Sequence, residues 1–279
     1  MSTLMNDIRK LTFIGGGNMA TALISGLKGK GLTASHMMVS DPNPEALARL
    51  SADYGVLNAP GPVAVEHADV VVLAVKPQLM NEALAALAPA LRRARPLIMS
   101  VAAGIPHAAL MRMIGPEARI VRCMPNRPAL NGCGATGLFA PAGVGSAERA
   151  LAQSIMGAVG VTVWVEHESQ LDTVTALSGS GPAYFFLFME ALEAAARARG
   201  LPEEVAHLLT LETAYGAAVM ARSATESLKT LREQVTSKGG TTAAALAVME
   251  GAHLRDIVAQ ALNAAERRSA ELGKEFAGP

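Results

Sequence analysis

The sequence of 279 residues predicts an α/β protein with a parallel sheet in its N-terminal part and an all-helical C-terminal part. Up to about Trp164, short apolar runs alternate with helical patterns, as in a sheet whose strands are joined by crossover helices. After about Glu168 the strand pattern ends, and long segments rich in Ala and Leu follow. We therefore expect two domains, residues 1–167 and residues 168–279.

The predicted strands share β-branched residues, short length and regular spacing. They are Leu11–Ile14, Met37–Ser40, Val70–Val75, Leu97–Val101, Ile120–Cys123 and Val161–Val165. Asn43 followed by Pro44 is typical of a helix start and predicts a helix over Pro44–Tyr54. Gly31 and Gly55 are expected to end the first two helices, because glycine adopts the left-handed conformation found there.

The C-terminal helices are unusually apolar. They are expected at Leu171–Leu177, Ala183–Arg199, Glu203–Ser223, Ser227–Val235, Thr242–Met249 and Leu254–Gly273. Thr213–Met220 is apolar over much of the helix circumference, and such a helix has to be covered on every side. A region of about 110 residues has too little mass to cover several such helices. We therefore expect a second copy of the chain to cover part of this surface.

Composition excludes several classes of protein. Lys plus Arg and Asp plus Glu number 24 each, and the absence of a basic run argues against nucleic acid or an anionic membrane as a partner. The apolar stretches are too short to span a bilayer, and the N-terminus has no pattern of a secretory signal. Two cysteines cannot form a disulfide framework or a four-ligand zinc site. We expect a cytoplasmic protein without a metal.

A glycine-rich turn follows the first predicted strand. Gly15, Gly17 and Ala20 form a GxGxxA pattern between that strand and a helix. In such a loop the first glycine permits a tight turn, the second lets the backbone approach a pyrophosphate, and the small third residue allows close helix packing. We expect a Rossmann-type domain that binds a dinucleotide, with Asn18 and Met19 at the N-terminus of the helix beneath the phosphates.

The second predicted strand ends at Ser40-Asp41, the position that recognises the adenosine ribose in such domains. The Asp41 carboxylate could accept hydrogen bonds from a ribose diol and would repel a 2′-phosphate, which favours NADH. The alternative is that Asp41 only caps a turn before Pro42. Both NADPH and NADH stay open as cofactors.

Further candidate residues follow the next strands, at the edge of the sheet where α/β proteins bind ligands. Ala74, Val75, Lys76 and Pro77 follow one strand, although Lys76 could equally shape the loop. Ala102 follows the next strand, among small residues that would let a nicotinamide ring lie close.

Three more segments carry polar groups in tight loops. Met124–Pro128 follows a strand, and Asn126 within it offers a donor and an acceptor. Ser178–Pro182 is a glycine-containing link between helices. Thr236–Thr242 is a glycine-rich loop that leads into a helix, where N–H groups and hydroxyls can converge on an anion. The alternative for this last loop is a plain connection with threonine caps.

Together these segments resemble the pyrroline-5-carboxylate reductase family. The likeness lies in Phe13–Ala20, Ala74–Gln78, Ser100–Gly104, Met124–Gly137, Ala176–Tyr184 and Val235–Glu250. The resemblance implies reduction of 1-pyrroline-5-carboxylate to L-proline with NADPH or NADH, and a homodimer with interlocked helical domains that can assemble into rings. This chain departs from the family at Arg127, where threonine is common, and at Lys238, where proline is common. Asp41 also stands where NADPH-preferring relatives tend to carry other residues.

The resemblance also implies roles for single residues. Ser237, Gly239, Gly240 and Thr241 would bind the substrate carboxylate, and Asn126 would add a further substrate contact. The Thr242 hydroxyl would donate to the imine nitrogen and so polarise it.

Two other functions are compatible with parts of this pattern. A hydroxyacid dehydrogenase also joins a Rossmann domain to helices, but it needs a lysine as acid and base, for which Lys238 is the candidate in a glycine loop. A dinucleotide sensor without turnover is the other alternative, and the intact loop at Gly239–Thr242 argues against it.

Overall fold

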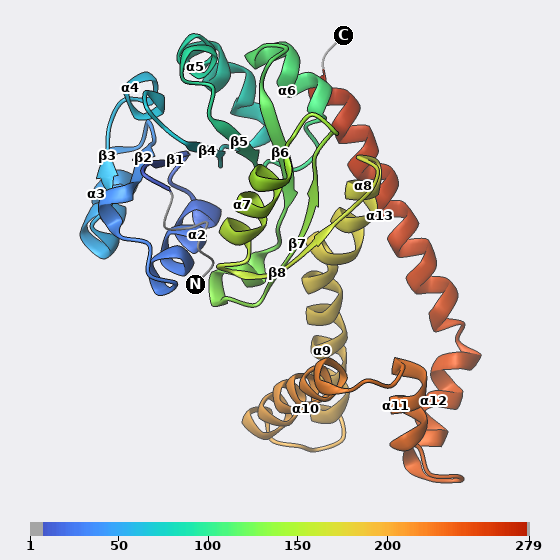
Figure 1. The fold of residues 1–279 in the computed structure, drawn as a ribbon. Coiled ribbons are helices and arrows are strands. Elements are labelled where there is room, and N and C mark those ends of the chain that lie inside the picture. Colours follow the sequence, from blue (N-terminus) through green and yellow to red (C-terminus); the bar gives the residue numbers. More distant parts are fainter. Residues whose placement is uncertain (1–7, 278–279) are drawn as a thin grey trace. The chain divides into compact units, whose positions relative to one another are not determined.

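The computed structural model describes residues 8–277 and divides the chain into two compact units. The first unit contains the residues up to 180 together with those from 264 onward, and the second contains residues 181–263. The α/β class with a helical C-terminal part is confirmed (Figure 1). The functional division between residues 167 and 168 stays a prediction.

The first unit is built on one sheet of eight strands in the order β3-β2-β1-β4-β5-β6-β7-β8. The strands are β1 (Leu11–Ile14), β2 (Met37–Ser40), β3 (Leu57–Asn58), β4 (Val70–Leu73), β5 (Leu97–Ser100), β6 (Arg119–Met124), β7 (Gly134–Phe139) and β8 (Gly160–Trp164). Strand order reverses between β1 and β4, which pair in parallel. Such a reversal marks the place where open α/β sheets bind their ligands.

Helices cover both faces of this sheet. They are α2 (Asn18–Gly29), α3 (Pro44–Tyr54), α4 (Gly61–Val65), α5 (Met80–Ala94), α6 (His107–Ile114), α7 (Ser146–Met156) and α8 (Gln170–Val174). Alternate strand residues face opposite sides, so Val70 and Val72 pack with α2 and α7 while Val71 and Leu73 pack with α5 and α6. Strands buried on both faces explain the continuous apolar runs of the sequence.

Each strand predicted from the sequence is present with small shifts of its ends, but two strands were missed. β3 has only two residues. β7 is interrupted by Gly and Thr, and it runs antiparallel to β6, whereas every other strand pair of the predicted parallel sheet is parallel. The physical reason is the short connection: residues 125–133 hold only a 3-10 turn, whereas a parallel return needs a dozen or more residues.

The predicted helix ends are confirmed at the second helix of the sequence. α3 spans Pro44–Tyr54, and the Asn43 side chain accepts a hydrogen bond from the Glu45 N–H at 2.9 Å. Gly55 has φ +73° and its N–H donates to the Ser51 carbonyl at 2.8 Å. Gly31, with φ +95°, likewise follows the end of α2.

The end of the chain completes the first unit. From residue 264 onward α13 (Leu254–Ala277) belongs to this unit, and Ser269 donates to the Asp172 carboxylate at 2.7 Å. Thr173 donates to Glu266 at the same distance, and Phe276 packs against the core that contains α5 and α6.

The second unit has almost no core of its own. It contains α9 (Gly181–Arg197), α10 (Glu203–Ser223), α11 (Leu228–Gln234), α12 (Thr241–Gly251) and the first part of α13. Within residues 181–263 only Gly181, Ala206 and Thr210 are buried. Large apolar side chains are exposed instead, including Phe185 at 70% and Tyr215 at 68%. Helices with this surface have to bury it against something else.

We predict opposite effects for two glycines of α2. A Cβ at Gly26 would lie 2.6 Å from the Ala158 carbonyl oxygen, whereas a Cβ at Gly29 would meet nothing within 4 Å. Gly26→Ala should lower the free energy of unfolding by about 1–3 kcal/mol, since the packed loop has to move. Gly29→Ala should be neutral or stabilising by up to about 1 kcal/mol, because alanine favours the helix. Urea unfolding of both variants checks this, and equal effects would contradict it.

Candidate functional site

The loop after β1 touches the ends of both neighbouring strands. Gly15 has φ +99°, and its N–H donates to the Ser40 carbonyl at the end of β2 at 2.8 Å. On its other side, a Cβ at Gly15 would lie 2.6 Å from the carbonyl oxygen of Ala74, just after β4. Both the conformation and the space therefore require glycine at this position.

Asp41 holds the next residues of the same loop. One oxygen of its carboxylate accepts from the Gly16 N–H at 2.6 Å, and the other accepts from the Asn43 N–H at 2.8 Å. The carboxylate thus joins the loop after β1 to the turn after β2. This arrangement contains the turn-capping contact foreseen as the alternative for Asp41, together with a contact to the glycine loop that the sequence did not indicate.

The start of α2 fits the phosphates of a dinucleotide. Gly17 is exposed, and a Cβ built on it would meet nothing within 4 Å. The first-turn N–H groups at Asn18 and Met19 have no intrahelical acceptor, as at the start of any helix. No side chain caps the helix at Gly17 in their place. Free N–H groups at the positive end of a helix, beside open space over a glycine, are the features that bind a pyrophosphate.

The remaining predicted cofactor residues lie at the same edge of the sheet. Ala74 and Val75 are half-buried and directly follow β4, where the Ala74 N–H donates to the Ile14 carbonyl at 2.7 Å. Lys76 is exposed and precedes the short turn that begins at Pro77. Ala102 is buried after β5. The sheet thus brings the predicted set to the edge next to β1 and β4, and their contacts with a cofactor stay a prediction.

Arg49 is a residue of this region that the sequence did not reveal. It lies on α3, and its guanidinium approaches the Gly16 carbonyl and the Thr21 hydroxyl, each at 3.4 Å. A sequence search for a cation just after Asp41 misses it, since the helix brings Arg49 back to the loop only after about two turns.

A second polar cluster lies beside the ends of β5 and β6. The Glu168 carboxylate accepts hydrogen bonds from the Arg122 guanidinium at 2.7 Å and from the backbone N–H of His107 at 2.5 Å. Burial lowers the pKa of His107, although the Glu168 carboxylate opposes that shift. Glu168 therefore fastens the start of α6 to β6, which is a structural role.

Asn126 is already engaged within the first unit. Its side-chain oxygen accepts from the Ala135 N–H at 2.9 Å, and its amide donates to the Ser178 carbonyl at 2.9 Å. These bonds join two of the loops singled out in the sequence. One amide hydrogen and one lone pair remain for a ligand, so the predicted substrate contact stays possible in chemical terms and untested.

The glycine-rich loop of the second unit leads into α12. Gly239 has φ +73°, and the Gly240 N–H donates to the Ser237 carbonyl at 3.1 Å. α12 begins at Thr241, and no side chain caps it at Gly240. Its first-turn N–H groups, at Thr241 and Thr242 among others, therefore lack intrahelical acceptors. Such a helix start can bind a carboxylate.

Hydroxyl groups and a cation surround this helix start. Ser237 and Thr241 are exposed, Thr242 is half-buried, and Lys238 is exposed within the loop. Ser237, Gly239, Gly240 and Thr241, predicted for the substrate, thus gather with Thr242 at one end of α12, whereas Asn126 belongs to the first unit. The predicted cofactor residues belong to the other compact unit.

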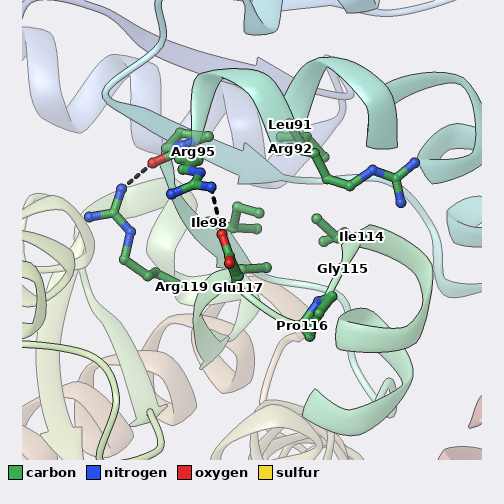
Figure 2. A pocket seen from close by; sticks show the side chains of 11 residues that line it. Leu91, Arg92, Arg95, Ile98, Ile114, Gly115, Pro116, Glu117 and Arg119 are labelled. Carbon is green, nitrogen blue, oxygen red and sulfur yellow. Dashed lines mark hydrogen bonds and ion pairs between the residues drawn. The ribbon is translucent and has the colours of Figure 1, made fainter.

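A cavity of about 230 Å³ lies at the opposite edge of the sheet, where α5 ends and β5 and β6 begin (Figure 2). Its walls are largely apolar, and at its mouth Arg95 pairs with Glu117 at 2.7 Å. The Arg119 guanidinium donates to the Arg95 carbonyl. None of the predicted site residues lines this cavity.

Residues 8–277 contain neither a candidate metal centre nor a helix that could span a membrane. No group of three or more His, Cys, Asp or Glu side chains there could hold a metal ion. In the same part of the chain, no helix is both long enough and apolar enough to cross a membrane.

Comparison with known proteins decides the family. Residues 168–272 match the model described as pyrroline-5-carboxylate reductase dimerisation, and residues 10–104 match the model described as NADP oxidoreductase coenzyme F420-dependent. A pyrroline-5-carboxylate reductase from Pseudomonas aeruginosa is 47% identical over 96% of this chain and 98% of its own length. The chain belongs to the pyrroline-5-carboxylate reductase family. A relative of the same name from Haemophilus influenzae is 46% identical over 95% of this chain and 98% of its own length.

Solved structures of the pyrroline-5-carboxylate reductase family have the same fold. The enzyme from Coxiella burnetii is 42% identical with a TM-score of 0.92, covering 95% of this chain and 99% of its own. The Plasmodium falciparum structure, which has NADP bound, is 29% identical with a TM-score of 0.83, covering 95% and 98%. A 3-hydroxyisobutyrate dehydrogenase from Mycobacterium tuberculosis is 17% identical with a TM-score of 0.50, which shows a related fold alone. The resemblance read from the sequence is therefore confirmed.

We predict that Gly17→Val abolishes measurable cofactor binding while the fold survives. The branched side chain would enter the open space over the α2 N-terminus, where no protein atom lies within 4 Å of the Cβ position. Affinity for NADPH and NADH should fall at least about a hundredfold, since a pyrophosphate could no longer reach the N–H groups. Calorimetric titration measures the affinity, and circular dichroism checks the fold. Unchanged binding would remove the loop from the cofactor site.

Proposed function

We propose that this chain reduces 1-pyrroline-5-carboxylate to L-proline with NADPH or NADH, the last step of proline biosynthesis, in the cytoplasm. The observation that carries the proposal is the 47% identity to a reductase of that name over nearly the whole of both chains. The open helix starts at Gly17 and Gly240 support it, because they offer sites for the two anionic partners of such a reaction.

The cofactor would be held by the first unit. We assign the pyrophosphate to the Gly15–Met19 loop, the adenosine ribose to Ser40 and Asp41, and the nicotinamide half to Ala74–Pro77 and Ala102. When bound, the reduced nicotinamide supplies a hydride. The residues of this unit orient the ring and keep it next to small side chains, which is positioning rather than acid–base work.

The substrate would be held by the loop of the second unit. Its carboxylate lies among the backbone N–H groups and hydroxyls around Ser237, Gly239, Gly240 and Thr241, with Lys238 adding positive charge. The Thr242 hydroxyl then donates to the imine nitrogen. That bond draws electron density from the carbon that receives the hydride, and it strengthens as charge develops on nitrogen. A threonine hydroxyl is too weak an acid to give up its proton fully at neutral pH, so Thr242 polarises the imine and the solvent supplies the proton.

The active form would be a homodimer whose helical regions interlock, with a ring of dimers as a further step. Support comes from the match of residues 168–272 to the dimerisation model and from the exposed apolar side chains of α9 and α10. A helical unit with only three buried residues gains its core by packing against a second copy.

An assay of NADPH and NADH oxidation with and without 1-pyrroline-5-carboxylate tests the proposed reaction. Oxidation that depends on the imine is expected, and in a separate reaction NADP+ or NAD+ should not be reduced by a hydroxy acid. Absence of imine-dependent turnover with either cofactor would refute the proposal.

Thr242→Val should slow hydride transfer by about a hundredfold, because it keeps the side-chain shape but removes one positioned donor. Single-turnover measurements at saturating substrate are the test, and cofactor affinity should be unchanged. Thr241→Val is the matched control from the same helix turn, and it should raise the substrate KM more than it lowers kcat. Ser237→Ala should behave like the control. A wild-type rate for Thr242→Val would mean that the loop only holds the substrate.

Light scattering should find a dimer or a larger assembly at micromolar concentration. Tyr215→Glu and Phe185→Glu place charges among the exposed apolar side chains of α10 and α9, so each should favour monomers and lower activity. Arg92→Gln, on α5, is the control and should leave the assembly intact. An active monomeric wild type would contradict the role of these surfaces.

A further inference from the structure

Both oxygens of the Asp41 carboxylate are engaged by the loops that it joins. Both of its carboxylate oxygens accept backbone N–H groups, from Gly16 at 2.6 Å and from Asn43 at 2.8 Å. A carboxylate bound in this way has fewer lone pairs for a ribose diol, and the two N–H dipoles reduce the field with which it repels a nearby phosphate. The presence of Asp41 after β2 is therefore a weaker argument for NADH than the sequence alone suggests.

Arg49 places a positive charge on the same side of the loop. Its guanidinium has two long contacts at 3.4 Å, to the Gly16 carbonyl and to the Thr21 hydroxyl. Within residues 8–277 it forms no ion pair with a carboxylate, Asp41 included. Most of its five N–H donors are therefore unused, and the side chain is exposed.

The Arg49 guanidinium lies beside the loop that contacts the turn after β2. The turn after β2 is where Rossmann domains meet the ribose 2′ position, and Gly16 contacts that turn through Asp41. A 2′-phosphate is present in NADPH and absent from NADH, and arginine binds phosphate with several parallel hydrogen bonds.

We propose that Arg49 of α3 binds the adenosine 2′-phosphate and makes NADPH the preferred cofactor of this chain. This inference rests on the dinucleotide site of the proposed function, and it deepens that proposal by naming the residue that selects the cofactor. The selecting cation comes from the middle of α3 instead of the turn after β2, where Asp41 serves as a brace for the glycine loop.

Two adenosine fragments that differ only in the 2′-phosphate give the sharpest test. Adenosine 2′,5′-bisphosphate and 5′-AMP would be titrated by calorimetry into the wild-type protein, Arg49→Gln, Arg49→Lys and Arg92→Gln. The wild type should bind the bisphosphate more tightly. Arg49→Gln should weaken bisphosphate binding about tenfold and leave 5′-AMP binding unchanged, because a charged hydrogen bond is lost. Arg49→Lys should keep part of the preference, and the α5 control Arg92→Gln should keep all of it.

Other outcomes overturn the inference. An unchanged ratio of the two affinities in Arg49→Gln would show that the 2′-phosphate lies elsewhere. An equal loss for both fragments, with a folded variant by circular dichroism, would assign Arg49 to the phosphate that the fragments share. A wild type that binds neither fragment would overturn both the inference and the dinucleotide site.

The fragment titration and the turnover assay can fail independently of each other. Imine-dependent turnover together with an unchanged fragment ratio would refute the role of Arg49 and leave the proposed function standing. A changed ratio of the two fragment affinities in Arg49→Gln, without imine-dependent turnover, would support the role of Arg49 and refute the proposed function.

Discussion

The close approach of Gly15 to the Ala74 carbonyl is the constraint on which the candidate cofactor site depends. A Cβ at Gly15 would lie 2.6 Å from that oxygen, so any other residue would separate the loop after β1 from the end of β4. The same glycine donates to the Ser40 carbonyl and thereby fixes the loop against β2. With both sides fixed, Gly16 reaches Asp41, and α2 starts with its free N–H groups at the edge of the sheet.

A second constraint governs the helical unit. With three buried residues in 181–263, this unit has little hydrophobic stabilisation of its own to offset the entropy of ordering its helices. Its structure and the shape of the loop before α12 should therefore depend on the partner that covers its apolar side chains. The proposed substrate loop starts a helix of this same unit, so the proposed function would link catalysis to assembly.

Local sequence patterns predicted the elements that are defined by residues at their own start and end. The Asn43-Pro44 start and the Gly55 end define α3 without help from the rest of the chain, and both appear as expected. β7 could not be found in the same way: glycine and threonine interrupt its apolar pattern, and pairing with β6 and β8 stabilises it. Strand pairing over that distance is a tertiary effect.

In the candidate site, too, local sequence patterns were predictable and contacts between distant segments were not. Glycine spacing located the loop at Gly15–Ala20, because close packing and a positive φ leave few alternatives to glycine. The contact of Asp41 with Gly16 and the partners of Asn126 were not predictable, since each depends on which loops the sheet brings together. Arg49 was not predicted from the sequence for a related reason. Its place beside Gly16 follows from how α3 packs, not from its position after β2.

The central claim is that a hydride passes from the nicotinamide held by this chain to the imine carbon of 1-pyrroline-5-carboxylate. The direct measurement is one turnover with NADPH or NADH that carries deuterium at both hydrogen positions of nicotinamide C4, followed by mass spectrometry of the product. The account predicts L-proline with a single deuterium on the ring carbon that was double-bonded to nitrogen. Oxidised cofactor without deuterated proline, or no oxidation of either labelled cofactor, would contradict it.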